Sequence, residues 1–198
     1  MMIFGVLAVC MAMVGGAGAT LIVDTGSSGQ FYYYLGSSQW LAGQFTTTQA
    51  YNIGAMQGDI WTAWQQGEVD ISICTDSSNA PGTPLFIKAF QSQAVGFEGW
   101  QGTTGIAGFL PAGTYWIAFT VPSSSSFEGG MGSNNTPPPS PLLSYAYNIN
   151  QGPWYTIGPP SYLVEARIEG SAVPIPGAAV LLGSGLLGLA GLRRKFKA

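Results

Sequence analysis

The segment 69–74 reads Val69-Asp70-Ile71-Ser72-Ile73-Cys74, and it decides the fold class of the chain. Three β-branched apolar residues alternate here with two polar residues and a cysteine. Strict alternation places the apolar side chains on one face of an extended segment and the remaining side chains on the other. This pattern is typical of a β-strand with one buried face. We therefore predict a half-buried strand over 69–74.

Other short segments on both sides of this strand have strand character. Segment 114–120 is apolar on both faces, which predicts a central strand with neighbours above and below. We expect the further strands at 21–23, 44–48, 51–53, 59–65, 85–90, 142–149, 154–157 and 162–169. Segments 44–48 and 51–53 are expected to form a pair around a tight turn. The Ser-, Gly- and Pro-rich stretch 123–140 is expected to form a long loop.

No helical period occurs between residues 20 and 170, and the composition agrees with an all-β domain. Gly and Pro together make 42 of the 198 residues, aromatics make 13%, and charged residues only 8%. About ten to twelve strands separated by turn signals suggest two packed antiparallel sheets. The predicted fold is an all-β, antiparallel, jelly-roll-like β-sandwich, flanked by an N-terminal signal helix and a C-terminal transmembrane helix.

The two ends of the sequence differ from this domain. Residues 1–19 begin with an apolar segment and end in Ala17-Gly18-Ala19, a small-residue pattern that predicts a secretory signal peptide. An uncleaved anchor is the alternative, because the segment has no Lys or Arg before its apolar run. Residues 20–170 form the predicted extracytoplasmic domain, and residues 171–198 form a separate C-terminal segment.

The C-terminal segment has three parts in order. It begins with Val173-Pro174-Ile175-Pro176-Gly177, continues with the uncharged apolar run 178–192, and ends with Arg193-Arg194-Lys195-Phe196-Lys197. The apolar run with its flank is long enough for a transmembrane helix of roughly 30 Å. A basic end next to a span stays in the cytoplasm, so the domain before it is expected outside.

This order of parts resembles the PEP-CTERM sorting signal of Gram-negative bacteria, in a Val-Pro-Ile-Pro variant with Ile175 in place of Glu. The resemblance implies processing by an exosortase-like membrane enzyme. The chain is then expected at the inner membrane in transit, with a cytoplasmic C-terminus, and later at the cell surface or in the extracellular matrix. Proteins of this family are associated with biofilm and exopolysaccharide. Segments 44–46, 69–73, 81–85 and 110–117 are similar to β-sandwich domains found upstream of such signals.

The charge distribution excludes one class of partner. Residues 20–170 contain all nine acids but only two bases, Lys88 and Arg167, which gives a formal charge of −7. Such a domain repels phosphate backbones, so we expect no nucleic acid partner. Its single cysteine, Cys74, is expected to be a small buried apolar residue.

Few residues carry the signals of catalysis. The chain has no histidine, which excludes Ser-His and Cys-His nucleophiles. Segment 21–28 contains Asp24-Thr25-Gly26 and resembles the catalytic loop of aspartic proteases, which need a second Asp that a dimer would supply. A strand ending in an Asp-Thr-Gly turn is the simpler interpretation. A glycosidase would need two facing acids, and no spacing selects a pair among Glu68, Asp70, Asp76, Glu98 and Glu128. We therefore predict a non-catalytic protein.

No cofactor or resident metal is predicted, although a structural calcium ion is a possible exception. Its oxygen ligands would come from Asp70, Asp76 and Asn79.

The aromatic residues suggest a binding function. The candidate rings are Phe31, Tyr32, Tyr33, Tyr34, Trp40, Trp61, Trp64, Trp100, Trp116, Trp154 and Tyr155. Exposed rings stack on sugar faces. Trp100 and Trp154 are expected in glycine-flanked loops and are the preferred glycan-stacking candidates. Filling of the core is the alternative for every ring.

Overall fold

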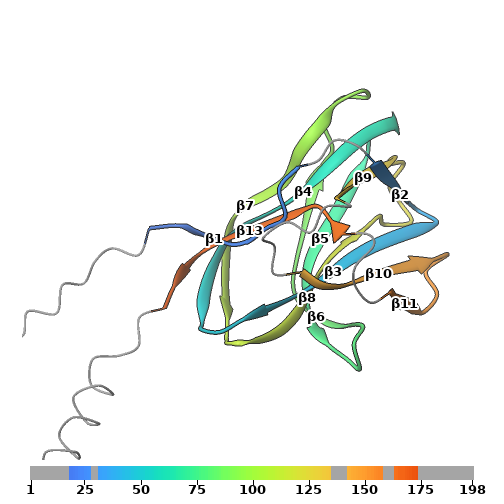
Figure 1. The fold of residues 1–198 in the computed structure, drawn as a ribbon. Helices are drawn as coiled ribbons and strands as arrows, with labels where there is room; N and C mark the ends of the chain where they lie inside the picture. Colours follow the sequence, from blue (N-terminus) through green and yellow to red (C-terminus); the bar gives the residue numbers. More distant parts are fainter. Residues whose placement is uncertain (1–17, 28–30, 135–141, 158–162, 174–198) are drawn as a thin grey trace, which may run out of the picture. The chain divides into compact units, whose positions relative to one another are not determined.

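The computed structural model describes residues 18–27, 31–134, 142–157 and 163–173. These residues form thirteen β-strands and no helix (Figure 1). The strands are β1 (Thr20–Asp24), β2 (Phe31–Gly36), β3 (Gln39–Thr47), β4 (Tyr51–Gln65), β5 (Glu68–Asp76), β6 (Pro81–Gln91), β7 (Glu98–Leu110), β8 (Gly113–Thr120), β9 (Glu128–Asn134), β10 (Leu142–Ile149), β11 (Trp154–Ile157), β12 (Leu163–Val164) and β13 (Ala166–Ala172). The predicted all-β class is confirmed.

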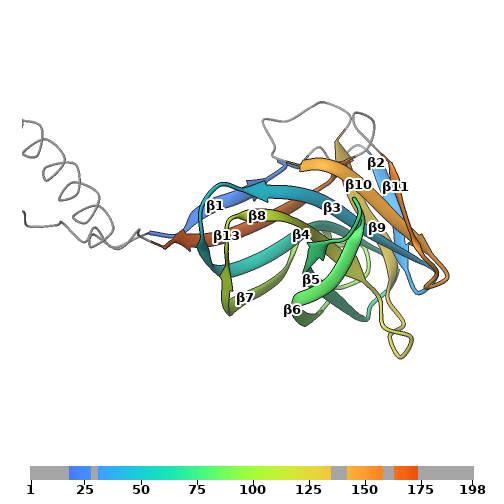
Figure 2. The same cartoon turned by 90° about the horizontal axis from the view of Figure 1, so that it is seen from below.

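All thirteen strands belong to one antiparallel sheet that curls around an interior (Figures 1 and 2). The strand order is β1-β13-β4-β9-β2-β3-β8-β5-β6, while β7 pairs with β4, β10 with β3, β11 with β10 and β12 with β9. Phe119 of β8 reaches Gly58 of β4 across the interior, so opposite walls of the curl touch. The fold is therefore sandwich-like, although hydrogen bonds join the layers that we predicted as two separate sheets.

The alternating segment at 69–74 lies in β5, where Val69, Ile71 and Ile73 are fully buried in the main core. On β8, Tyr115, Ile117 and Phe119 enter the same core. The intervening side chains of β8 are also buried, in a second cluster formed by Ala42, Cys74, Trp116, Ala118 and Ala146. β8 pairs with β3 on one edge and with β5 on the other, as predicted for a central strand.

Two predictions of local structure are wrong. Segments 44–48 and 51–53 contribute to β3 and β4, but these strands do not pair with each other: β3 pairs with β2, β8 and β10, whereas β4 pairs with β7, β9 and β13. Within the expected loop 123–140, residues 128–134 form β9. In both cases most of the ladder partners are strands distant in sequence, which local propensity cannot predict.

The first and last strands of the domain lie side by side. β1 pairs with β13, with Thr20 opposite Gly170 (Figure 1). Among the described residues, no helix has the length and apolar character needed to cross a bilayer. Most of the predicted signal peptide, residues 174–177 of the Pro motif, the apolar run 178–192 and the basic stop at Arg193, Arg194 and Lys195 lie outside the described residues. Val173 is the last residue described.

Candidate functional site

A glycine-rich strand forms a track without side chains of its own on the outer face of the sheet, and side chains of neighbouring segments cover it. β9 lies between β2 and β4, and it reads Glu128-Gly129-Gly130-Met131-Gly132-Ser133-Asn134. Met131 is fully buried in the core, so alternation directs Gly130 and Gly132 to the outer face. Gly130 lies opposite Tyr34 on one side and Trp61 on the other. Without side chains on β9, large residues of β2 and β4 can approach one another across it.

Four aromatic rings lie along this track, and we call them the aromatic strip: Tyr32, Tyr34, Trp61 and Trp64. Their ring centroids are 5.5 Å apart for Tyr32 and Trp61, 5.9 Å for Trp61 and Trp64, and 6.3 Å for Tyr34 and Trp64. Trp64 is 61% exposed, whereas the other three rings are half-buried. Each ring therefore packs against the next, and the strip keeps an accessible apolar surface at Trp64.

Two exposed carboxylates flank the aromatic strip. Glu98 of β7 lies directly opposite Trp61 in the ladder between β4 and β7. Glu128 of β9 lies opposite Gly36 of β2 and Gln65 of β4. Residues directly opposite in an antiparallel pair share a face of the sheet. Glu98 and Glu128 therefore lie on one surface. They are two of the five acids among which the sequence selected no catalytic pair.

Two further acids are buried beside the strip. Asp59 is 1% exposed and Glu165 is fully buried. The Asp59 amide donates to the Glu165 carbonyl at 3.0 Å, and the Glu165 amide donates to the Gly132 carbonyl at 3.0 Å. The hydroxyl of Ser27 donates to the Asp59 carboxylate. These backbone bonds hold both acids next to the strip.

The electrostatics of the strip are negative. The pKa of the Tyr32 hydroxyl lies far above its ordinary value, first because of burial and then because of the neighbouring carboxylates of Glu98, Asp59 and Glu165. An ionised phenol next to these groups would add a further negative charge, which the acids oppose. Tyr32 therefore stays neutral across the physiological range.

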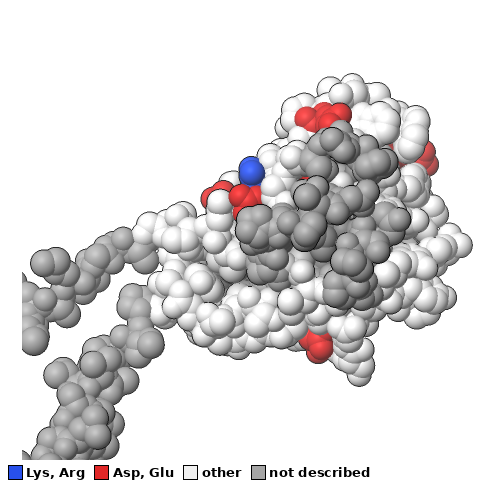
Figure 3. All heavy atoms as spheres, viewed as in Figure 1, with Lys and Arg blue, Asp and Glu red and all other residues white. Residues whose placement is uncertain are grey.

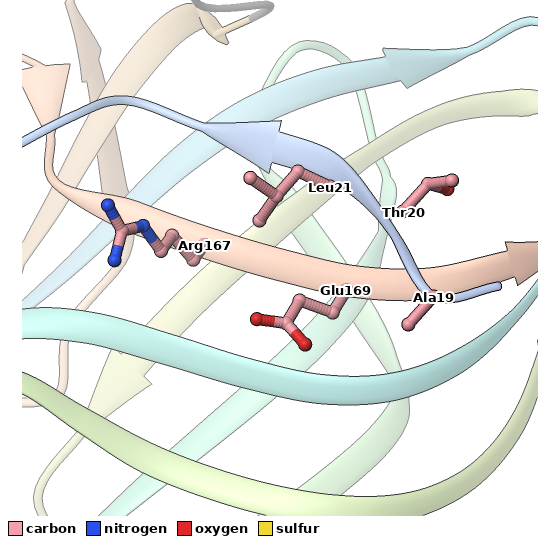
Figure 4. Close-up of a pocket in the computed structure, with 5 residues that line it drawn as sticks. All are labelled: Ala19, Thr20, Leu21, Arg167 and Glu169. Carbon is pink, nitrogen blue, oxygen red and sulfur yellow. The ribbon is translucent and has the colours of Figure 1, made fainter.

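Trp100 lies in strand β7 and not in the predicted loop, directly opposite Asp59. The guanidinium carbon of Arg167 lies 3.9 Å from the centroid of the Trp100 ring. Arg167 Nε also donates to Asp24 Oδ1 at 3.0 Å. Figure 4 shows Arg167 and Glu169 projecting to the same side of β13 at a hollow beside β1. Because its guanidinium lies over the ring, Arg167 occupies one face of Trp100.

Segment Asp24-Thr25-Gly26 forms a turn at the end of β1. The Gly26 amide donates to Asp24 Oδ1 at 3.0 Å, and Gly26 has a φ of +68°. Thr25 is fully buried, and its hydroxyl accepts from the Ala166 amide at 2.8 Å. These contacts match the simpler interpretation of the motif, a strand that ends in an Asp-Thr-Gly turn.

Trp154 opens strand β11, which matches the predicted strand 154–157 and replaces the glycine-flanked loop expected for this ring, and it packs half-buried on the second cluster. Its ring centroid is 6.5 Å from that of Trp40.

The candidate calcium ligands lie near this cluster. Asp76 Oδ1 accepts from Trp116 Nε1 and from Gln44 Nε2, each at 2.7 Å.

The other two candidate calcium ligands have different surroundings. Asn79 Oδ1 accepts from Gln44 Nε2 at 3.1 Å. Asp70 lies further along β5, opposite Thr120 of β8 and Ala89 of β6. Within the described ranges, no group of three or more His, Cys, Asp or Glu side chains is arranged to hold a metal ion. Asp76 and Asn79 share Gln44 as a hydrogen-bond donor, and Asp76 also accepts from Trp116.

Cys74, the single cysteine of residues 20–170, is buried as predicted. Cys74 is 4% exposed in the second cluster, and burial raises the pKa of its thiol, although a contact with Ser72 acts in the opposite direction. A thiol in this state is poorly reactive.

Sequence reasoning named every ring of the strip as an aromatic candidate but preferred Trp100 and Trp154. The local signal was available in Trp61-Thr62-Ala63-Trp64 and in the glycine run of 129–132. Their proximity depends on the strand order β4-β9-β2, which the sequence alone does not reveal.

Comparison of the chain with models of known protein families and with curated protein sequences found no match.

Proposed function

We propose that the chain is an exported, non-catalytic protein of the bacterial cell surface or extracellular matrix. The supporting observation is the ordered C-terminal segment, in which a Val-Pro-Ile-Pro motif precedes an uncharged apolar run and a basic stop. In this proposal the domain is a jelly-roll-like sandwich between a signal helix and a transmembrane helix. The membrane and an exosortase-like enzyme are its partners during sorting, before delivery to the surface of a Gram-negative cell.

The mass of the mature protein tests this proposal. Export and sorting remove residues 1–19 and the segment after about Pro176, so the isolated protein is shorter at both ends. Replacing Pro174 and Pro176 with Ala blocks C-terminal processing but leaves N-terminal cleavage intact. A mature protein that retains its basic tail would indicate a permanent membrane anchor instead.

We further propose that the domain binds polysaccharide through the aromatic strip. The observation that favours this function is a row of four packed rings in the order Tyr32, Trp61, Trp64 and Tyr34, in which Trp64 is 61% exposed. Aromatic rings bury the apolar C–H faces of sugars, while nearby polar groups bond to the hydroxyls. Trp100 and Trp154, which the sequence favoured, are secondary candidates because each is half-buried.

Trp64→Ala tests the glycan-binding proposal. We expect it to weaken binding of exopolysaccharide at least about tenfold, because it removes the exposed ring of the strip. Phe109→Ala is the matched control, since Phe109 is 56% exposed but lies on β7 opposite Asn52, outside the strip and outside the candidate rings. Equal binding by the two variants would refute a role for the strip.

A further inference from the structure

We propose that the aromatic strip selects a cationic glycan, a polymer of amino sugars with free primary ammonium groups. The inference rests on the proposed polysaccharide binding and specifies its ligand class. It follows from the arrangement of rings and acids on one surface and from the near absence of neutralising bases in the domain.

Charge complementarity is the first argument. Nine acids and two bases occur in the described part of the chain, and one of these bases, Arg167, is already paired with Asp24 at 3.0 Å. The other, Lys88, is on β6, which pairs with β5 and not with the strands β2, β4 and β9 that carry or adjoin the strip. On the face shown in Figure 3, red acidic atoms occur in several places and blue basic atoms in one. An anionic polysaccharide therefore meets repulsion, whereas a cationic one is attracted.

The position of the acids is the second argument. Glu98 lies opposite Trp61, and Glu128 lies opposite Gly36, so exposed carboxylates approach the strip from β7 and from β9. A sugar on the strip thus has Glu98 beside Tyr32 and Trp61, and Glu128 beside Gln65, as carboxylate partners for its ammonium groups. Neutral sugars form only hydrogen bonds with these groups and gain no charge pairing.

The rings themselves are the third argument. The face of an indole or phenol ring attracts a cation, and recognition of ammonium ligands by several aromatic rings is a common use of this attraction. Trp64 lies between Trp61 and Tyr34, with centroid distances of 5.9 and 6.3 Å. A sugar that carries an ammonium group thus gains from both its apolar face and its charge on the same surface.

Binding of matched oligosaccharides to the full-length chain tests the inference. The probes are a glucosamine hexamer, an N-acetylglucosamine hexamer, a neutral glucose hexamer and a uronic acid hexamer. At mildly acidic pH and low salt, where the amines and carboxylates are both charged, we expect the glucosamine hexamer to bind at least about tenfold tighter than the acetylated one. The uronic acid hexamer is expected not to bind.

Two variants separate a specific site from general attraction to an acidic protein. The double variant Glu98→Gln/Glu128→Gln is expected to lose the preference for free amines. The double variant Glu68→Gln/Glu169→Gln changes the net charge by the same amount and is expected to keep this preference. The uncharged change Trp64→Ala is expected to weaken glucosamine binding at least about tenfold. Glucosamine binding that survives Trp64→Ala would mean non-specific charge attraction and would overturn the inference.

Failure of the inference can be told apart from failure of the proposed function. If the neutral and acetylated hexamers bind as tightly as glucosamine, the domain binds glycans but the charge selection is refuted. If none of the hexamers binds, the proposed glycan function and the inference fail together.

Discussion

The indole N–H of Trp116 donates a hydrogen bond of 2.7 Å to Oδ1 of Asp76. Trp116 is fully buried on the outer face of β8, while Asp76 is at the exposed end of β5. Gln44 Nε2 donates to the same carboxylate oxygen at 2.7 Å. A surface acid therefore satisfies the polar atom of a buried ring and closes the second cluster.

Asp76→Ala is expected to lower the free energy of unfolding by about 1–3 kcal/mol, because it leaves a buried N–H donor without its acceptor. Asp76→Asn keeps an acceptor oxygen at the same position and is the control, with a smaller loss. Chemical denaturation followed by Trp fluorescence measures both. Equal stability of Asp76→Ala and the parent chain would show that the Trp116 bond contributes nothing net.

The same contacts predict how stability changes in acid. Burial alone would raise the pKa of Asp76, but the bonds from Trp116, Gln44 and the Asn79 amide lower it below its ordinary value. An acid with a lowered folded-state pKa stabilises the fold above its unfolded pKa of about 4 and loses this contribution as pH falls through the lower, folded value. Unfolding curves between pH 7 and pH 2 should show this loss in the parent chain. Asp76→Asn should show less of it, and an identical acid limb would contradict the assignment.

Asp70 should have the opposite effect on the pH dependence of stability. Burial, followed by the charge of Glu68, raises the pKa of Asp70 above its ordinary value. An acid with a raised folded-state pKa binds its proton more tightly in the folded state, so it destabilises the fold at neutral pH. Asp70→Asn is expected to increase stability at pH 7 by less than about 1 kcal/mol, since the side chain is only half-buried. The gain should vanish below pH 4, and a gain that persists there would implicate packing instead.

The stacked pair of Arg167 and Trp100 gives a prediction about side-chain shape. Arg167→Lys keeps the positive charge near Asp24 but removes the planar group that covers the indole ring. We expect a loss of about 0.5–1 kcal/mol of unfolding free energy. Combining it with Trp100→Leu in a double-mutant cycle isolates the stacking energy. Strictly additive losses would mean that ring and guanidinium do not interact.

The parts of the fold that follow from the sequence are those whose signal is local. Strand β5 was predicted from the alternation of apolar and polar residues, and β8 from its apolar character on both faces. The predicted closing strand 162–169 corresponds to β12 and β13, which are separated at Glu165, and Ala166 and Ile168 are buried on one face. In these strands local pattern and tertiary packing agree.

Strands β7 and β9 were not predicted, because their glycines weaken every local strand signal. β9 is ordered by ladders to β2 on one side and to β4 and β12 on the others. The aromatic strip depends on the same long-range pairing, since Tyr32 and Trp61 are on separate strands and meet across Gly130. Residue types alone suggested a binding surface, but the selection of rings required the strand order.

Gly130 is the residue on which the strip depends most directly. A Cβ atom at this position would lie 2.8 Å from Cβ of Tyr32 and 3.3 Å from the Tyr33 carbonyl oxygen, which is too close for either neighbour to keep its place. Gly130→Ala is therefore expected to displace Tyr32 and to separate its ring from Trp61. The unfolding free energy should fall by about 1–3 kcal/mol.

Gly54→Ala is the matched control on β4, where the nearest atom to an added Cβ is the Glu169 carbonyl oxygen at 3.8 Å. This variant should be as stable as the parent chain or slightly more stable, because it reduces the freedom of the unfolded state without a clash. Oligosaccharide binding should weaken in Gly130→Ala and stay unchanged in Gly54→Ala, measured by Trp fluorescence titration at a temperature where both variants are folded. Parent-like binding by a folded Gly130→Ala protein would show that the close approach of β2 and β4 side chains over β9 does not create the binding surface.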